Sequence, residues 1–449
     1  MGDKGVKIHP VLFQIRLLYA DGFVKANLFH FSPELNPPFM SETCNSRHFS
    51  WLMKSCFPNP NDSKSLSPIP LHHHASLCSL PDDLLLECLS RVPSSSLPSV
   101  SLVCRRWSRL LSSRAFPTLR RLNGLLHHSV FALSAFNNGL FAAAFWFQNQ
   151  VVHEWKIALH FPLRALPLEN LSSARLCAIG PTIYVIGRNE TLRYDTWSGT
   201  VGAKSPIVFP RKKFAAAVVN RKIYVAGGGS REATAVEEYD PDSDTWRVVS
   251  HSPRRRYGCV GAAVDGVFYV IGGLKIGSDS ANEVPRAAAG SEAHVYASSM
   301  DLYDVETRGW LRSRTLPGGG CVVAACATGG YVYVLASHAV ELSFWRFNGL
   351  RKNNSGGGFG EWCRIKSPPL PTQLRIDSTV RFSCVGVEDK VVLVQVSGGI
   401  DDLFRRSGRT VRGMREGLVL VYDCSGGEWS RGADLPEVIR RAVCVSVEH

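Results

Sequence analysis

Runs of arginine and lysine are the feature of this sequence best suited to a chemical task. They include Arg211-Lys212-Lys213, Arg254-Arg255-Arg256 and Arg440-Arg441, and single arginines stand at Arg175 and Arg375. A guanidinium group is a planar fork that can pair with two oxygens of a carboxylate or a phosphate. These residue types therefore favour noncovalent binding of anions.

Residue sets for covalent or metal chemistry lack the spacing that such sites require. No Cys-x-x-Cys occurs, and the triplet His72-His73-His74 lies in a proline-rich linker, where solvated histidines are expected. The glycine-rich run at 356–360 lacks the following Lys and helix of a phosphate-binding loop. The later histidines do not recur at a common interval along the sequence. They are His153, His160, His251, His294 and His338. The sequence therefore predicts no catalytic residue, no metal site and no cofactor.

Composition is typical of a globular protein and gives a positive charge. The chain has 449 residues, of which 45% are hydrophobic and 20% charged, and its formal net charge is +13. That charge permits anionic partners without selecting one, because it does not say where the charge lies. The 13 cysteines are odd in number and scattered. We interpret them as reduced thiols of a cytosolic or nuclear protein.

Two apolar segments raise the question of a membrane or secretory signal. The segment at 8–31 is interrupted by Arg16 and Asp21 and has no clean cleavage site, so a signal peptide is not predicted. The segment at 122–153 has no Lys, Arg, Asp or Glu and is long enough to span a bilayer. However, the turn signal Asn137-Asn138-Gly139 divides it. Two buried strands joined by a hairpin are predicted there.

Residues 79–121 predict a small helical module. Pro81 followed by Asp82 and Asp83 is typical of a helix start, because proline is tolerated in the first turn and acids complement the helix dipole. A second helix is expected from about Ser96, with Pro98 in its first turn. The residues at helical spacing are Leu84, Leu85, Cys88, Leu89 and Val92, then Leu97, Val100, Val103, Cys104, Trp107, Leu110 and Leu111. Such a module must pack on the rest of the chain or on a partner, because it is too small to bury these faces itself.

Three motifs in this module resemble the F-box. They are Ser79-Leu80-Pro81-Asp82-Asp83-Leu84-Leu85, Arg91-Val92-Pro93 and Val103-Cys104-Arg105-Arg106-Trp107. The resemblance implies that the helices dock on a Skp-type adaptor of cullin–RING ubiquitin ligases. The residues it implies in adaptor binding are Leu80, Pro81, Leu84, Leu85, Leu89, Val92, Pro93, Leu97, Val103, Cys104 and Trp107. Two alternatives stay open. One is an intramolecular helical subdomain, and the other is a helix-turn-helix that would use Arg105, Arg106, Arg109 and Arg114.

Three later segments share one internal pattern. In each, an apolar run and a glycine pair are followed by Tyr-Asp and then by a Trp seven residues after the Tyr. The aromatic pairs are Tyr239 and Trp246, Tyr303 and Trp310, and Tyr422 and Trp429. Glycine pairs end a strand where the backbone bends, and Asp begins a turn. Each repeat is therefore interpreted as four short strands, with the aromatic pair packed inside it.

Weaker copies fill the intervals, and the whole pattern resembles the kelch repeat over 129–447. One copy has Tyr194, but its Trp197 comes too early for the usual place. The resemblance implies a mostly β fold, a six-bladed kelch-type β-propeller, preceded by the helical module and a poorly ordered extension at 1–78. The first unit lacks its innermost strand. We expect residues 442–447 to supply it and to close the ring, which removes an exposed edge.

The basic runs fall on one face of such a propeller. If the strands of a blade are called a to d from axis to rim, the b–c and d–a connections share a face, because strand direction alternates. The d–a connections carry the expected target-binding residues Arg175, Arg211, Lys213, Arg254, Arg255, Arg375, Arg440 and Arg441. The last b–c insertion adds Arg405, Arg406, Arg409, Arg412 and Arg415. This face is predicted to capture an acidic or phosphorylated segment. About half of these arginines could instead cap carbonyls or bridge blades.

The two resemblances together imply a substrate receptor of a Skp–cullin–F-box ubiquitin ligase, in the cytoplasm or nucleus. Such a receptor is not an enzyme; it holds the target near a conjugating enzyme and so raises the effective concentration of target lysines. No nucleic-acid or membrane partner is expected. Two alternatives are a kelch scaffold outside any ligase and a kelch-propeller metalloenzyme, since some kelch proteins resemble copper oxidases or iron-dependent specifier proteins. The metalloenzyme is disfavoured because the histidines do not share a ligand spacing.

Overall fold

A computed structural model describes much of the chain after residue 78. The described residues are 79–136, 139–146, 154–162, 173–229, 234–276, 290–338, 341–351, 359–370, 380–397, 417–439 and 441–449. The chain divides into two units, Met1–Leu85 and Leu86–His449. The expected extension at 1–78 and the triplet His72-His73-His74 lie outside the described residues.

Short helices occupy residues 82–122. They are α3 (Asp82–Ser90), the 3-10 turn η2 (Ser94–Ser96), α4 (Leu97–Ser101), α5 (Arg105–Leu111) and α6 (Ala115–Leu122). The start of α3 after Pro81 agrees with the prediction. The predicted second helix is two helices, because Cys104 has an extended backbone (φ −161°, ψ 164°) and its Sγ accepts a hydrogen bond from the Trp107 amide at the start of α5. Helix α6 was not predicted.

Six antiparallel four-stranded sheets follow, which confirms the predicted six-bladed β-propeller. From the axis outward, blade 1 is β26 (Val443–Glu448), β1 (His128–Phe136), β2 (Gly139–Trp146) and β3 (Trp155–Pro162); blade 2 is β4 (Arg175–Ile179), β5 (Thr182–Ile186), β6 (Thr191–Asp195) and β7 (Val201–Lys204); blade 3 is β8 (Ala215–Val219), β9 (Lys222–Ala226), β10 (Ala235–Asp240) and β11 (Thr245–His251).

Blade 4 is β13 (Val260–Val264), β14 (Val267–Ile271), β16 (Ser299–Asp304) and β17 (Gly309–Thr315); blade 5 is β18 (Cys321–Thr328), β19 (Tyr331–His338), β20 (Glu341–Asn348) and β21 (Trp362–Ile365); blade 6 is β22 (Arg381–Val387), β23 (Lys390–Ser397), β24 (Val419–Asp423) and β25 (Trp429–Arg431).

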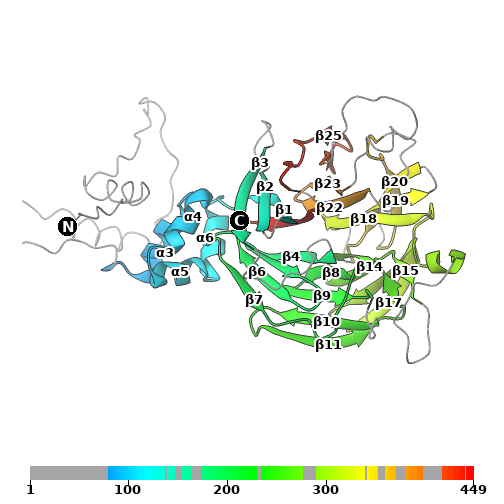
Figure 1. Cartoon of the computed structure of the whole chain (residues 1–449), viewed down its shortest axis with the longest axis horizontal. Coiled ribbons are helices and arrows are strands. Elements are labelled where there is room, and N and C mark those ends of the chain that lie inside the picture. The colour runs from blue at the N-terminus through cyan, green and yellow to red at the C-terminus, as the bar shows by residue number, and fades with distance from the viewer. Residues whose placement is uncertain are drawn as a thin grey trace, which may run out of the picture. The chain divides into compact units, whose positions relative to one another are not determined.

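The C-terminal strand closes the ring, as the sequence predicted. Strand β26 pairs antiparallel with β1, with Ser129 opposite Val447 and Leu133 opposite Val443. Figure 1 shows the C-terminal end of the chain beside β1. The innermost strands contact one another in the order β26, β4, β8, β13, β18 and β22, and β22 contacts β26 again. The ring of blades is therefore closed by pairing between the last strand, β26, and the first strand, β1.

Apolar side chains form a separate cluster between every two neighbouring blades. One cluster joins Ile183 of blade 2 to Phe131 of blade 1, and the opposite side of the ring shows the same arrangement between blades 4 and 5. The repeated aromatic pairs lie inside this packing, with ring centroids 5.0 Å apart for Tyr239 and Trp246. The indole of Trp246 also donates to the Ser205 carbonyl after blade 2 (3.0 Å). These pairs hold blades together, as the sequence interpretation proposed.

The apolar segment at 122–153 contains a hairpin. Strands β1 and β2 pair from Ser129 opposite Trp146 to Phe136 opposite Gly139. None of the helices in the described part of the chain is long and apolar enough to cross a membrane. The predicted hairpin is therefore confirmed.

Candidate functional site

Exposed apolar side chains mark the helices as a candidate docking site. In the first unit, Leu84 of α3 has 50% of its surface exposed. In the second unit, Leu102 and Val103, between α4 and α5, are 80% and 43% exposed. Pro81, Pro93 and Cys104 are exposed as well. Leu102 was missed because it falls outside the motifs that carried the resemblance.

Other residues expected to bind the adaptor are buried. Leu85, Leu89, Leu97 and Trp107 are all buried, and Leu80 and Val92 are partly buried. A buried side chain can hold the helices in place but offers little surface to a partner. Leu85, Leu89, Leu97 and Trp107 lie where they support the helices, and their part in adaptor binding stays a prediction. Pro81 and Leu84 are exposed in the first unit, and Pro93, Val103 and Cys104 are exposed in the second.

The buried Arg120 of α6 ties the helices to the start of the propeller. Its guanidinium group donates to the carbonyls of Ser90 (3.0 Å), Val92 (2.7 Å) and Leu125 (3.1 Å), and to Ser94 Oγ (2.7 Å). Burial lowers the pKa of Arg120. No sequence motif pointed to this residue, because three of its four partners are backbone carbonyls.

The d–a and b–c connections of the propeller lie on the same face, as the sequence predicted. Strand β12 (Arg256–Tyr257), in a d–a connection, pairs with β15 (Leu274–Lys275), in a b–c connection. Likewise, the Gly228 amide of a b–c connection donates to the Arg256 carbonyl (2.7 Å). The d–a and b–c connections therefore share one face of the propeller.

Arg211, expected to bind the target, is part of the core. Its side chain is 0% exposed and pairs with the equally buried Glu237 of β10, with Nη2 2.6 Å from Oε1. It also donates to the carbonyls of Gly227 (2.8 Å) and Ala235 (2.7 Å). The prediction of a surface role for Arg211 is wrong, because blade 3 supplies a buried acid to neutralise it.

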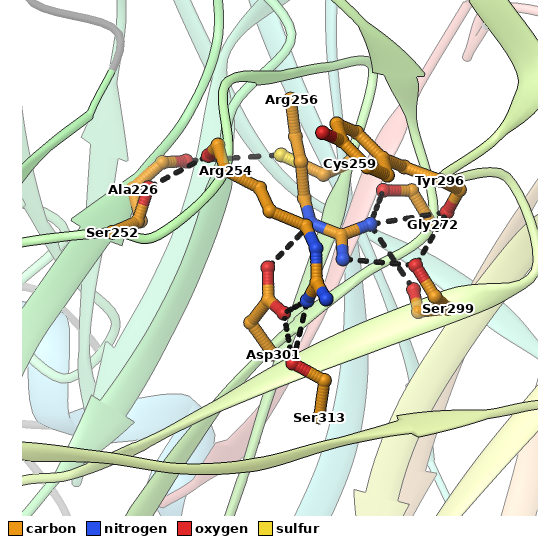
Figure 2. Close-up of polar contacts among 10 residues, drawn as sticks. All are labelled: Ala226, Ser252, Arg254, Arg256, Cys259, Gly272, Tyr296, Ser299, Asp301 and Ser313. Atoms are coloured by element: carbon orange, nitrogen blue, oxygen red, sulfur yellow. Dashed lines mark hydrogen bonds and ion pairs between the residues drawn. The ribbon is translucent and has the colours of Figure 1, made fainter. Parts of the chain in front are cut away.

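Blade 4 repeats this arrangement around Asp301 (Figure 2). Arg256 is buried, and its Nε lies 2.8 Å from Asp301 Oδ2. It also donates to the carbonyls of Gly272 (2.8 Å) and Tyr296 (3.0 Å). Arg254 pairs with the other oxygen of Asp301 and donates to Ser313 Oγ. Arg254 is partly buried and shares the single carboxylate of Asp301 with Arg256, so its role in target binding stays a prediction.

The remaining basic residues of this face divide into exposed and partly buried ones. Lys212, Arg255 and Arg441 are exposed, whereas Arg175 and Lys213 are partly buried. Arg381, which the sequence interpretation missed because it starts a strand, is exposed as well. The remaining expected residues lie outside the described part of the chain: Arg375, Arg440, Arg405, Arg406, Arg409, Arg412 and Arg415.

A metal site finds no support in the described ranges. Among those residues, no group of three or more His, Cys, Asp and Glu side chains is placed to hold a metal ion. The exposed cations of the described part of this face, Lys212, Arg255, Arg381 and Arg441, suit the binding of anions.

Comparisons with known proteins agree with the two modules. A model of the F-box domain matches residues 77–119, and a model of the Kelch motif matches residues 210–253. The F-box/kelch-repeat protein At5g26960 of Arabidopsis thaliana is 63% identical over 421 residues, which cover 91% of this chain and 100% of that protein. The F-box/kelch-repeat protein OR23 of Arabidopsis thaliana is 28% identical over 261 residues, or 49% of this chain and 55% of that protein.

Proposed function

The chain belongs to the plant F-box/kelch-repeat protein family, and on that basis we propose that it is the substrate-recognition subunit of a Skp–cullin–F-box ubiquitin ligase. The helices at 82–122 bind the Skp-type adaptor, and through it the cullin and RING subunits. The propeller captures a target protein for ubiquitination and degradation. The chain supplies no catalytic group; it raises the effective concentration of target lysines at the conjugating enzyme.

One observation carries this proposal. Leu84, Leu102 and Val103 expose large apolar side chains within the segment that matches the F-box domain. Exposed apolar side chains of this kind are typical of protein interaction sites. The same chain holds a closed propeller, the second module of the proposed receptor. A chain with two such binding modules is suited to bring two proteins together.

The cysteines support the proposed location in the cytoplasm or nucleus. The ten cysteines of the described residues are free thiols. Cys326 and Cys384, on neighbouring inner strands, are free although their sulfur atoms lie 3.2 Å apart. Free thiols at this density are expected in a reducing compartment.

The test of adaptor binding uses changes at exposed positions, so that folding is spared. We expect Leu102→Asp with Val103→Asp to lower the affinity of the full chain for a purified Skp-type adaptor by about tenfold or more, which corresponds to about 1.4 kcal/mol. Leu84→Asp tests the first unit separately. The matched control is Val248→Asp, at an exposed position of the outermost strand of blade 3. Wild-type adaptor affinity in both test variants would refute the proposed ligase role.

A further inference from the structure

The starts of the innermost strands carry cations in four of the six blades. Arg175 is the first residue of β4, and Arg381 is the first residue of β22. Lys213 and Arg441 each stand two residues before an inner strand, β8 and β26 respectively. These blades follow one another around the ring as 6, 1, 2 and 3. Because every inner strand begins on the face of the d–a connections, these four residues lie at the same end of neighbouring inner strands, along one side of the channel mouth.

Contacts across blades place Arg175 and Lys213 beside neighbouring blades. The guanidinium group of Arg175 in blade 2 donates to the carbonyls of Phe214 (2.7 Å), Ala174 (3.3 Å) and Cys259 (3.5 Å), so it holds neighbouring blades together and adds its charge to the mouth. The Nζ of Lys213 lies 5.4 Å from the centre of the Tyr257 ring, which precedes blade 4. Burial lowers the pKa of Arg175 and of Lys213, and the charge of Arg381 lowers both further. The positive charge of Arg381 in blade 6 thus repels the charges of Arg175 in blade 2 and Lys213 in blade 3.

No carboxylate neutralises these charges among the described residues. No ion pair of the described chain involves Arg175, Lys213, Arg381 or Arg441. On the same face Arg256 pairs with Asp301 and Lys275 pairs with Glu292, whereas the exposed Lys212 and Arg255 have no ion pair among the described residues. Cations held close together without counter-charges produce a positive potential that attracts anions. The channel mouth therefore carries positive charge that no acidic side chain of the described chain neutralises.

We propose that Arg175, Lys213, Arg381 and Arg441 form an anion-binding site at this mouth, which binds an acidic or phosphorylated segment of the target protein. The proposal rests on the proposed function, because it names the chemistry by which the propeller selects its target. A single peptide strand fits a cluster confined to the axis. Nucleic acid would instead need a row of cations that follows successive phosphates, and these four cations are grouped at the starts of neighbouring inner strands.

The test compares two double variants matched in charge and backbone conformation. Lys213 and Arg441 have positive φ angles of 54° and 51°, a conformation that Asn adopts readily. Lys213→Asn with Arg441→Asn therefore removes two charges from the mouth with little strain. The control is Arg221→Asn with Arg308→Asn, at φ 63° and 52°. These two exposed residues lie in a–b and c–d turns on the opposite face. Arg381→Gln, at an exposed strand start, is an independent third variant.

Binding is measured by fluorescence anisotropy on the full chain. The probes are labelled peptides of equal length whose central residues are glutamates, phosphoserines or glutamines, and labelled polyuridine. We expect the glutamate or the phosphoserine peptide to bind, with an affinity that falls as salt is raised. Lys213→Asn with Arg441→Asn should weaken it by about tenfold, Arg381→Gln should weaken it less, and the control should not change it. Comparing the two anionic peptides distinguishes carboxylate from phosphate.

Two outcomes overturn this proposal. One is equal affinity of the wild type, the mouth variants and the control for both anionic peptides, including no binding at all. The other is tighter binding of polyuridine than of either peptide. Adaptor binding is measured on the same samples. Loss of peptide binding with normal adaptor binding would therefore reject the channel-mouth site and leave the proposed function standing.

Discussion

The indole of Trp197 meets the ring of Phe116 edge to face, with the ring centroids 4.9 Å apart and an interplanar angle of 85°. Phe116 belongs to α6, Trp197 follows β6 of blade 2, and both side chains are buried. In blades 3, 4 and 6 the tryptophan comes seven residues after the tyrosine, but Trp197 comes three residues after Tyr194. The early position is explained by its partner, because Trp197 packs on a helix instead of on the tyrosine of its own blade.

The first prediction follows from this contact. Replacing a buried Phe or Trp by Ala typically costs about 3–5 kcal/mol, so Phe116→Ala and Trp197→Ala should each lower the free energy of unfolding by about that much. An edge-to-face pair contributes about 0.5–1.5 kcal/mol beyond area burial. A double-mutant cycle, measured by urea unfolding, should show a coupling of this size. Strictly additive losses would mean that α6 and blade 2 are not energetically linked.

The second prediction concerns ring closure. Deletion of residues 440–449 removes β26, leaving β1 unpaired on its inner side and exposing the apolar surface around Phe131. Because an unpaired inner strand is a template for aggregation, we expect aggregation or cooperative loss of the propeller. Size-exclusion chromatography and thermal melting measure this outcome.

The control for ring closure is Glu448→Gln, which keeps the strand. It weakens only the side-chain pair with Arg121, whose Nη2 lies 2.8 Å from Glu448 Oε2 at the surface. A surface pair of this kind contributes about 1 kcal/mol or less, so the control should stay monomeric. A deleted chain that is monomeric with an unchanged melting temperature would show that β26 is dispensable for closure.

Features that repeat or alternate locally were predictable from the sequence. The seven-residue spacing of Tyr239 and Trp246 recurs in two other blades, and a repeat identifies the blade without any coordinates. The turn at Asn137 and the unpaired first strand led to the hairpin and the closing strand. Helix α6 was missed because only Phe116 and Arg120 are buried in it, which is a weak periodic signal.

The role of each arginine was not predictable from its position in a loop. Arg211 and Arg256 depend on Glu237 and Asp301, which are 26 and 45 residues away in the sequence. A signal was present, because these two blades have an acid two residues before the tyrosine of strand c. Leu192 and Leu420 occupy that place in blades 2 and 6. If these acids had been paired with the arginines that precede them in the sequence, the buried arginines could have been distinguished from the exposed ones.

The third prediction tests the buried pair of Arg211 and Glu237. Breaking a buried ion pair by removing one partner typically costs about 3–5 kcal/mol, because the other charge stays buried without compensation. Glu237→Leu should therefore lower the free energy of unfolding by about that amount. Arg211→Met combined with Glu237→Leu should recover much of the loss. Urea unfolding of the two variants decides between them, and a double variant less stable than Glu237→Leu would contradict this account.

The fourth prediction is a pH dependence at the C-terminal residue. His449 is 3% exposed, its Nε2 lies 3.2 Å from Ser129 Oγ, and its ring stands edge-on to Phe131 at 5.4 Å. Burial, together with the nearby charges of His127, Arg120 and His128, lowers the pKa of His449 from 6.5 to about 4. The folded protein thus holds this imidazole neutral, whereas the unfolded chain binds a proton below about pH 6.5.

The sign of the effect follows from this difference in bound protons. Between about pH 6.5 and pH 4 the unfolded chain binds more protons at His449, so stability falls as the pH is lowered through that interval. The stabilising contribution is fully present above about pH 6.5. By linkage, lowering the pH from about 7.5 to about 5 should cost about 2 kcal/mol through this residue. The variant His449→Gln cannot take up the proton. Its free energy of unfolding should therefore fall by about 2 kcal/mol less than that of the wild type over the same pH range.

The control is His251→Gln, because His251 is exposed at the end of β11 and should behave like the wild type. Urea unfolding at both pH values measures the difference, and equal losses in the wild type and His449→Gln would show that the closing strand does not sense acid through His449.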